Sequence, residues 1–527
     1  MSAAAHHPRP KEACVTCKTR KKKCDKALPS CSYCTGKNLD CRYVAVPRRR
    51  AYPSPSTDSS SHTAAADLHG LTSETSGRSV QANRALTESP SSVRPALYRA
   101  HLASLEDVYI SVQNLIRSTG EFIDDLTSRY FRTFHTHLPI IARTRFQDSF
   151  ITTGSTPSPD SSVLLLVICL ITYIPNADSG PQNGRTPPIT RQSLCLATKA
   201  LLAQVHGSMK PSVPLIQATL LLATYEYASG KPEVALATIA TCARMAYAAR
   251  IHIRLQCTTD ATSRLEAEEA WNTWWGISIS ERAFMCEAGT LDQPLTTSFP
   301  SEEARLPVDR VILDRGDFIN PDTIPDIPIS ACPTATNVGG FGRAAQTACL
   351  VDRMFKAMPI QEVTTALPLL ESVDAKLQSS LGVILNQGLD RSWHYCTALA
   401  VTLRSLYTLH NHILHLLCQP ISVSSRPLDE WNQSSLAALD TATTMAIDMA
   451  RWHYTSLPAE RPPDISPVHI YVVRAAMEHL RARRRGAAAA AAMRPDAEAD
   501  SDLPWPETAC EDLEMYLQRI EYQWVAA

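Results

Sequence analysis

Glycine is scarce in this chain, with 18 residues in 527, and neither a glycine-rich phosphate-binding loop nor a Gly-x-Ser-x-Gly elbow occurs in it. Nucleotide-binding α/β folds normally need more glycine at their turns. Long hydrophobic runs are also missing: the longest, residues 163–174, has twelve residues, whereas a membrane span needs about 20. We therefore expect neither an enzyme nor a membrane protein, and the apolar run predicts a buried helix.

The chain has little net charge, −1 in total, but this charge is unevenly distributed. Residues 9–50 contain thirteen Lys and Arg against three acidic residues, a net charge of +10, which leaves −11 for the remainder. A short basic segment on a long acidic body indicates that one end only contacts nucleic acid. Because residues 1–10 are polar, we expect no secretory signal, and the cysteines should be thiols or metal ligands, not disulfides.

Six of the 16 cysteines lie within 28 residues and repeat the spacing Cys-x2-Cys-x6-Cys twice. They are Cys14, Cys17, Cys24, Cys31, Cys34 and Cys41. A two-residue gap lets both thiolates of a pair bind one tetrahedral Zn²⁺ at about 2.3 Å. Six thiolates give two ions four ligands each only if two of them bridge, so the count predicts a binuclear cluster with two Zn²⁺.

Pairs of the form Cys-x2-Cys also occur in zinc ribbons and knuckles that bind protein, and in redox dithiols. The residues between the second and third cysteines favour nucleic acid instead, because five of the six positions are basic. These are Lys18, Arg20, Lys21, Lys22 and Lys23. A basic run is often only a solvated face, but here metal ligands bracket it on a short helix that can present it to a groove. The thiolates and two Zn²⁺ together carry about −2, so the segment stays strongly positive.

Residues 13–43 resemble the Zn2Cys6 binuclear-cluster domain of fungal transcription factors, including Lys-Cys-Asp at 23–25, Pro29 before the fourth cysteine and Tyr43 after the sixth. The resemblance implies that Cys14 and Cys31 bridge the two zinc ions. Cys17 and Cys24 would complete the first site, and Cys34 and Cys41 the second. It also implies a nuclear, DNA-binding transcription regulator of RNA polymerase II genes, with residues 10–46 as the DNA-binding domain.

The same resemblance implies that Arg20 and Lys21 contact base edges in the major groove of double-stranded DNA, where the family typically recognises CGG-like triplets. The other basic residues are expected to contact phosphates, and these are Lys18, Lys22, Lys23 and Lys26. Control of a metabolic or secondary-metabolite gene cluster is a family-level expectation. The alternative is a zinc-dependent protein-interaction module attached to a ligand-sensing helical body.

Residues 47–95 predict a disordered linker, since 16 of the 45 residues from 51 to 95 are Ser or Thr. The arginine triplet at 48–50 would extend the phosphate contacts or serve nuclear import. Beyond the linker, an apolar stripe with heptad-like spacing is a candidate for a coiled coil in a homodimer: Tyr98, Leu102, Leu105, Tyr109, Val112 and Ile116. Only about three heptads are present and further apolar residues widen the stripe, which favours a helix that packs on its own domain.

Residues 96–480 show helical periodicity and predict a large all-α domain. Segments 130–140, 217–252 and 269–282 resemble the fungal transcription-factor regulatory region, the last of them with three tryptophans. Glu281-Arg282 stands where the family usually has Asp-Arg, which leaves one pairing between helices open. Near the end of this region His410, His412, His415 and Cys418 have metal-binding side chains, but their spacing favours core or surface residues. The scattered Cys169, Cys195, Cys242, Cys286 and Cys349 are interpreted as small core residues.

Residues 481–527 contain an alanine tract at 487–492 and a terminal segment, 496–527, with nine acidic residues against one arginine. Interleaving of acidic and apolar residues is typical of activation segments that fold on a coactivator or the general transcription machinery, as in an activator. The same pattern fits a last amphipathic helix, 507–524, docked on the body. The sequence leaves both alternatives open.

Overall fold

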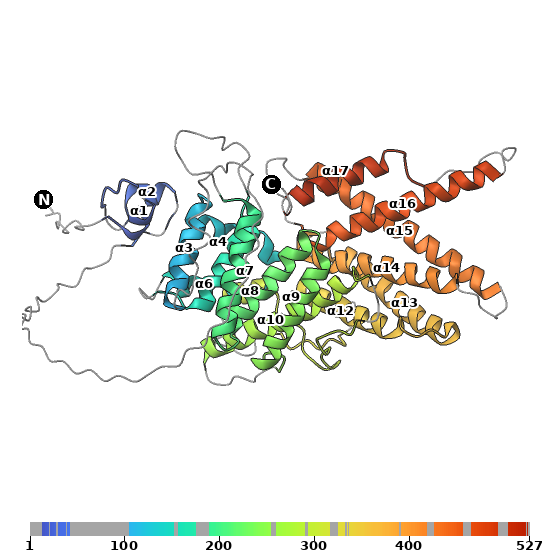
Figure 1. Cartoon of the computed structure of the whole chain (residues 1–527), viewed down its shortest axis with the longest axis horizontal. Helices are drawn as coiled ribbons and strands as arrows, with labels where there is room; N and C mark the ends of the chain where they lie inside the picture. Colours follow the sequence, from blue (N-terminus) through green and yellow to red (C-terminus); the bar gives the residue numbers. More distant parts are fainter. Residues whose placement is uncertain are drawn as a thin grey trace, which may run out of the picture. The chain divides into compact units, whose positions relative to one another are not determined.

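The computed structural model describes residues 13–20, 22–27, 30–37, 39, 41–42, 105–151, 156–174, 189–253, 260–289, 293–316, 325–331, 335, 337–388, 392–418, 426–456, 465–493, 504–522 and 524. The chain divides into two compact units, residues 1–89 and 90–527. The predicted fold class is confirmed: the first unit carries the cysteine cluster, and the second is built from helices (Figure 1). The expected linker, 47–95, lies outside the described residues, as do Lys21, Pro29 and Tyr43.

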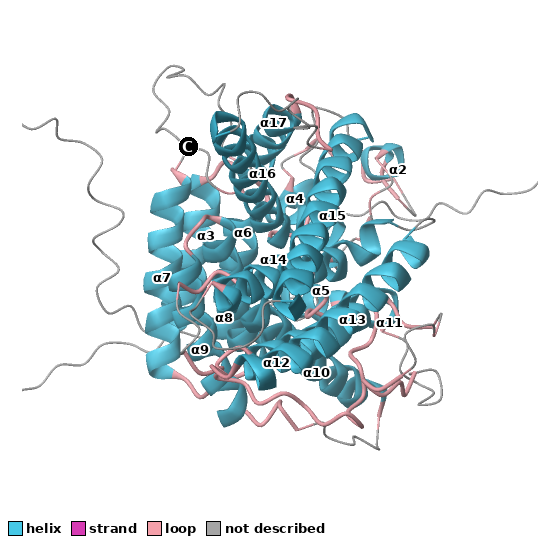
Figure 2. Ribbon diagram, turned by 90° about the vertical axis from the view of Figure 1, so that its right-hand side faces the viewer, coloured by secondary structure: helices cyan, strands magenta, loops and turns pink. Residues whose placement is uncertain are grey.

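Within its described residues, the second unit contains helices and loops and one isolated β-bridge (Figure 2). The helices are α3 (Val108–Ser118), α4 (Ile123–Arg132), α5 (Arg143–Ile151), α6 (Pro159–Thr172), α7 (Arg191–Ser208), α8 (Val213–Ala228), α9 (Pro232–Ala248), α10 (Ala261–Met285), α11 (Arg310–Arg315), α12 (Gly340–Ala357), α13 (Val363–Gly388), α14 (Cys396–Leu417), α15 (Arg426–Ser456), α16 (Val468–Met493) and α17 (Ala509–Tyr522), with 3-10 turns η1 (Leu105–Asp107), η2 (Phe134–Thr136) and η4 (Ser392–Tyr395). Helix α14 lies near the centre and packs against α10, α12, α13, α15 and α16 (Figure 2).

Local sequence signals set the beginnings of several helices. The side chains of Thr190, Ser212 and Asp260 each accept a hydrogen bond from the backbone N–H three residues later, which caps α7, α8 and α10. Pro159 and Pro232 occupy the first turns of α6 and α9, where a missing N–H costs nothing. These helices therefore begin where their own residues satisfy the unpaired donors.

The apolar run found in the sequence forms α6, which is buried on all sides. Every side chain from Ser162 to Thr172 is buried, and α3, α4, α7 and α8 pack around the helix. Across the described helices, none combines the length and the apolar character that crossing a bilayer requires. Helix α3 directs Val112 and Ile116 of the apolar stripe, together with Val108, into the core beside α6, whereas Tyr109 of the same stripe is half-buried.

Helix α10 lies very close to its neighbours at Gly276. A Cβ added there would lie 2.9 Å from Ile140 Cγ2 and 3.0 Å from Leu220 Cδ2. On the same helix, the indole N–H groups of Trp271 and Trp275 both donate to the Arg305 carbonyl, at 3.1 and 3.2 Å. The three-tryptophan helix is thus fixed by close backbone packing on one side and by hydrogen bonds on another.

The pairing left open by Glu281-Arg282 is resolved by the buried side chain of Arg282. Its guanidinium lies 2.7 Å from Asp352 Oδ1 on α12 and 3.0 Å from Glu281 Oε2. Glu281 also accepts hydrogen bonds from the backbone N–H groups of Thr296 and Thr297. Arg282 therefore joins α10 to α12, while Glu281 holds the loop that follows α10.

The domain boundary predicted between residues 480 and 481 is wrong, because it falls within α16, which runs unbroken from Val468 to Met493. The alanine tract belongs to this helix, as the high helix propensity of alanine allows. Beyond it, α17 packs on α15 and α16 and belongs to the same compact unit. Of the two alternatives for the C-terminal segment, the structure contains the docked helix.

Replacing Arg282 with alanine should destabilise the second unit by about 3–5 kcal/mol, because it leaves the buried Glu281 carboxylate without its counter-charge and leaves Asp352 paired only with the exposed Lys356. The urea midpoint of tryptophan fluorescence measures the loss. Arg353→Ala is the matched control: this arginine is adjacent to Asp352 in sequence but forms a surface pair with Glu302, and its removal should cost less than about 1 kcal/mol. Equal shifts in the two variants would contradict the assignment.

Candidate metal centre and nucleic-acid interface

The cysteine-rich unit is built from two similar halves, each with one short helix. Helix α1 (Val15–Thr19) is capped by Cys14, and α2 (Ser32–Gly36) by Cys31. In each half the sulfur of the capping cysteine accepts the backbone N–H of the cysteine three residues later, at 3.4 Å for Cys17 and 3.5 Å for Cys34. The Cys-x2-Cys pairs therefore form one helical turn each, and the sequence repeat is also a structural repeat.

The six sulfur atoms form two overlapping groups of four. One group is Cys14, Cys17, Cys24 and Cys31, the other is Cys14, Cys31, Cys34 and Cys41, and within each group the sulfurs lie within 4.8 Å of one another. The Cys14–Cys31 and Cys17–Cys31 sulfur distances are 3.7 and 3.5 Å. A tetrahedral site with Zn–S bonds of about 2.3 Å requires sulfurs about 3.8 Å apart. The cluster fits two Zn²⁺, and Cys14 and Cys31 are the sulfurs that the two groups share.

The environment of the sulfurs explains why a cation is needed. Loss of water raises the pKa of the Cys14 and Cys17 thiols and raises that of Cys34 to about 12. Cys31 differs, because the backbone N–H of Cys34 lowers its pKa to about 6. Zinc binds thiolates, so the ion must supply the positive charge that keeps the other sulfurs deprotonated. With four sulfurs in each group and no open position, such a site is structural.

Two contacts outside the sulfur cluster hold the halves together. The Asp25 carboxylate accepts hydrogen bonds from the Ser32 backbone N–H at 3.1 Å and from the Ser32 hydroxyl at 2.5 Å. These bonds lower the pKa of Asp25. The Val15 N–H donates to the Arg42 carbonyl at 2.9 Å and so joins the two ends of the unit. In the sequence Asp25 stands out only as part of the Lys-Cys-Asp motif, because its partner Ser32 lies seven residues away in the other half.

Among the basic residues expected to contact DNA, Lys18, Lys22 and Lys23 are exposed, whereas Arg20 and Lys26 are half-buried. Arg20 directly follows α1 and is its C-terminal cap. Lys21 lies outside the described residues. The corresponding stretch of the second half, 35–40, has one basic residue, Lys37, so the dense positive charge belongs to the first half.

The histidines near the end of the helical region and the scattered cysteines were the other candidate site residues. His410 is buried, with Nε2 3.2 Å from Asp374 Oδ1 and Nδ1 3.3 Å from Ser435 Oγ. In the part of the chain that the structure describes, the two cysteine groups are the only clusters with metal-binding geometry. Burial raises the pKa of the Cys286 thiol to about 11 and that of Cys169 to about 12, as expected of inert core cysteines.

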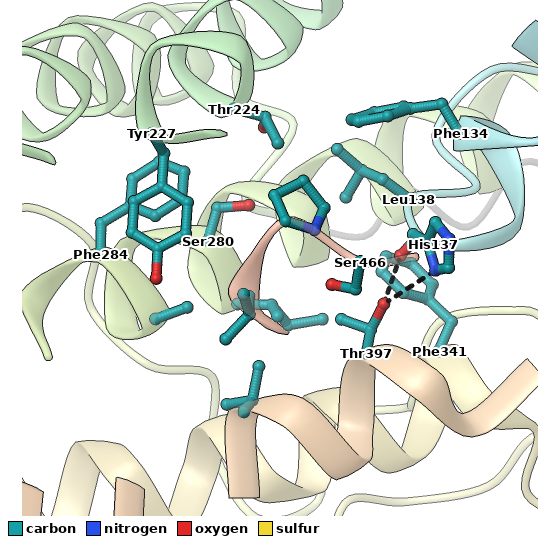
Figure 3. A pocket seen from close by; sticks show the side chains of 15 residues that line it. Phe134, His137, Leu138, Thr224, Tyr227, Ser280, Phe284, Phe341, Thr397 and Ser466 are labelled. Carbon is teal, nitrogen blue, oxygen red and sulfur yellow. Dashed lines mark hydrogen bonds between the residues drawn. The ribbon is translucent and has the colours of Figure 1, made fainter. Parts of the chain in front are cut away.

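One pocket of the helical unit lies where its N-terminal and C-terminal helices meet (Figure 3). Its walls come from η2, α8, α10, α12, α14 and the start of α16, and the cavity between them is small, about 40 Å³. The lining is mainly apolar, with the hydroxyl groups of Thr224, Ser280, Thr397 and Ser466 among it. The Tyr227 hydroxyl is buried and has no hydrogen-bond partner among the described residues.

Removing zinc should unfold the first unit and leave the second intact, because the metal-binding energy of so small a unit is its folding energy. A strong chelator should release two Zn²⁺ per chain. All eight tryptophans lie beyond residue 270, so their fluorescence reports on the helical unit, and its urea transition should not change. Cys17→Ser should lower the zinc content, whereas Cys418→Ser, at an exposed cysteine of the second unit, should leave it at two. If removal of zinc also abolishes the urea transition of the tryptophan fluorescence, the two units do not unfold independently and the prediction is wrong.

Comparison with known families matches both units. The fungal Zn(2)-Cys(6) binuclear cluster domain matches residues 12–51, and the fungal specific transcription factor domain matches residues 127–286. Transcription factor BOA15 of Botryotinia fuckeliana (strain B05.10) is 27% identical over 130 residues, which cover 25% of this chain and 68% of that protein. No solved structure matches. The chain therefore carries both a fungal Zn(2)-Cys(6) binuclear cluster domain and a fungal specific transcription factor domain.

Proposed function

We propose that this protein is a nuclear, sequence-specific DNA-binding regulator of RNA polymerase II genes that recognises CGG-like triplets in the major groove. The observation that supports it most is the run of basic residues placed directly between two ligands of a rigid metal cluster. Such a scaffold fixes the backbone of the run without a hydrophobic core. In this proposal residues 10–46 bind DNA, 47–95 are the linker, and the helical unit regulates a metabolic or secondary-metabolite gene cluster.

Within this function Arg20 and Lys21 contact the acceptor edge of guanine, and the surrounding lysines contact phosphates. Arg20 lies at the C-terminal cap of α1 and its side chain is half-buried. Lys18, Lys22 and Lys23 are exposed, which suits contacts that position the protein without recognising sequence. Cys14, Cys17, Cys24, Cys31, Cys34 and Cys41 are the proposed zinc ligands, with the first and fourth bridging. A homodimer would bind two triplets, and the coactivator or general transcription machinery would be the protein partner.

Arg20→Ala and Lys21→Ala should each weaken binding to a CGG-containing duplex by about 1–3 kcal/mol and reduce the preference for CGG over other triplets. Fluorescence anisotropy with the full chain, at several salt concentrations, measures both effects. Lys23→Ala should instead weaken binding to all duplexes alike and reduce the salt slope by about 0.9.

Lys37→Ala is the matched control, since Lys37 ends α2 as Arg20 ends α1, and it should change the triplet preference little. If the preference for CGG survives in both Arg20→Ala and Lys21→Ala, the assignment of these residues fails. If substitutions in the basic run leave both the DNA affinity and its salt dependence unchanged, the zinc-cluster unit would instead be a protein-interaction module.

A second candidate function, sensing of a small molecule by the helical unit, is favoured by the pocket of Figure 3. Its small cavity, apolar walls and few hydroxyl groups suit only a small, neutral, mostly apolar compound. A bound compound should raise the melting temperature of the full chain as its concentration rises. Filling the space with Ala283→Leu should remove this shift, and Ala482→Leu, at an exposed position of α16, should not. A shift that persists in Ala283→Leu rules this pocket out.

A further inference from the structure

Four arginines of the helical unit lie at the ends of helices that pack together, and we call them the arginine patch: Arg132, Arg143, Arg310 and Arg315. Arg132 is the last residue of α4 and Arg143 is the first of α5, while α11 begins and ends with the other two. Arg310 is half-buried, and the other three are exposed. Each of the three helices therefore contributes at least one positive charge from its end.

Two contacts bring α4, α5 and α11 together at these ends. The guanidinium carbon of Arg143 lies 5.6 Å from the centroid of the Phe131 ring on α4, a cation–π contact that orients the arginine. Gly316, which ends α11 with a φ of +61°, packs closely on Thr144: a Cβ added there would lie 2.9 Å from the Thr144 hydroxyl oxygen. Arg143 and Arg315, the sequence neighbours of these two residues, are thus held at one junction.

A third contact joins α11 to η2 and places Arg310 at the same junction. Asp314 Oδ1 lies 3.0 Å from Nε2 of the buried His135. Burial lowers the pKa of His135, and so do the nearby charges of Arg310 and Arg143, so both arginines lie close to this ring. His135 is therefore neutral at neutral pH and adds no positive charge to the patch.

Neither an internal ion pair nor the local helix explains these arginines. Within the described residues, no arginine of the patch forms an ion pair, whereas Arg145, two positions after Arg143, pairs with both Glu266 and Glu269. Arg143 and Arg310 each occupy the first position of a helix, where the helix dipole disfavours a cation. The patch therefore concentrates positive charge at a local cost, although the chain outside residues 9–50 carries −11.

The arrangement of the patch indicates what kind of anion would bind it. Guanidinium groups bind phosphate and carboxylate oxygens through paired hydrogen bonds. Because the side chains come from three helices and most are exposed, they suit an extended ligand with several negative charges better than a single small anion. A nucleic-acid backbone and an acidic protein segment both have this character.

We propose that the arginine patch contacts phosphates of the DNA duplex beside the site that the zinc-cluster unit binds. This inference rests on the proposed function, in which residues 47–95 are a linker. A flexible chain of 49 residues spans about 40 Å on average, which corresponds to about 12 base pairs at 3.4 Å each. The chain thus holds the duplex near the patch at a high effective concentration, an advantage that a separate acidic protein lacks. Such contacts add affinity without recognising sequence.

The test measures binding of the full chain to two duplexes by fluorescence anisotropy at several salt concentrations. The short duplex ends about three base pairs beyond the CGG site, and the long one continues for about 20 more on each side. Wild type should bind the long duplex at least about tenfold more tightly at about 0.05 M salt. Its salt slope on the long duplex should be steeper by about 2–3, since each phosphate contact contributes about 0.9.

The triple variant Arg143→Gln/Arg310→Gln/Arg315→Gln should lose most of this gain in affinity and slope on the long duplex and bind the short one as wild type does. Because these side chains form no ion pair among the described residues, the urea midpoint of the tryptophan fluorescence should stay unchanged. The corresponding Arg→Lys triple variant should keep the slope, because counterion release depends on charge.

The control removes the same charge from three other helices, through Arg244→Gln/Lys376→Gln/Arg485→Gln. These residues are exposed on α9, α13 and α16, and the control should keep the gain on the long duplex. Equal losses in the control and in the patch variant would show an effect of net charge alone and overturn the proposal.

The remaining outcomes separate this inference from the proposed function. If the patch variant keeps the full gain on the long duplex, the patch does not contact DNA. If, in addition, fluorescein-labelled polyglutamate binds wild type but not the patch variant, the patch is a surface for acidic protein instead. Failure to bind the short duplex, with the patch-dependent gain on the long one intact, contradicts CGG recognition alone. Failure to bind either duplex overturns both.

Discussion

The helical unit depends on charged side chains of α10 that are buried and must each meet a fixed partner. Glu268 pairs with Arg305, Glu269 with Arg145, and Arg282 with Asp352. Burial raises the pKa of Glu269, although Arg145, the Ala142 N–H and Gln217 oppose the shift. An ion removed from water gains little net stability from its partner but loses much when misplaced. These pairs therefore favour one packing arrangement over others. They fix the rotation of α10 about its axis and its position along that axis relative to α5, α12 and the segment around residue 305.

The first unit meets the same problem with the opposite chemistry. Its described residues, which lie within 13–42, are too few to build an apolar core, and four of its six cysteines are fully buried. Buried thiolates are stable only beside a cation. Zinc supplies this positive charge in the first unit, as arginine side chains do for the buried carboxylates of the helical unit. The two units thus share one constraint, a buried charge with an imposed partner, and differ in whether that partner comes from the chain or from solution.

What the sequence could predict follows from how local each feature is. The cysteine cluster could be predicted because its ligands lie within 28 residues at regular spacing. The buried helix α6 could be predicted because its residues are apolar on every side. The partner of Arg282 could not be predicted, since Asp352 lies 70 residues away and no local sequence pattern indicates the pair. The boundary at 480 was misplaced because a change of composition was taken for an end of structure, although arginine and alanine are both good helix formers. For α17, composition describes the helix but not which surface its apolar face covers.

Salt acts differently on two charged interfaces of this chain. Binding of the basic run to DNA releases counterions condensed on the duplex, so affinity falls steeply and in proportion to the number of phosphates contacted. Arg451, Arg474 and Arg481 pair with single carboxylates of α17, which condense no counterions. Only ordinary screening weakens these pairs, and their separations are shorter than the Debye length of about 8 Å at physiological salt. Because the apolar face of α17 does not respond to screening, its packing on α15 and α16 persists at salt concentrations that weaken DNA contact. The steep response therefore belongs to DNA binding and the shallow one to the C-terminal helix, which lets a single salt titration of the full chain assign each effect to its own interface.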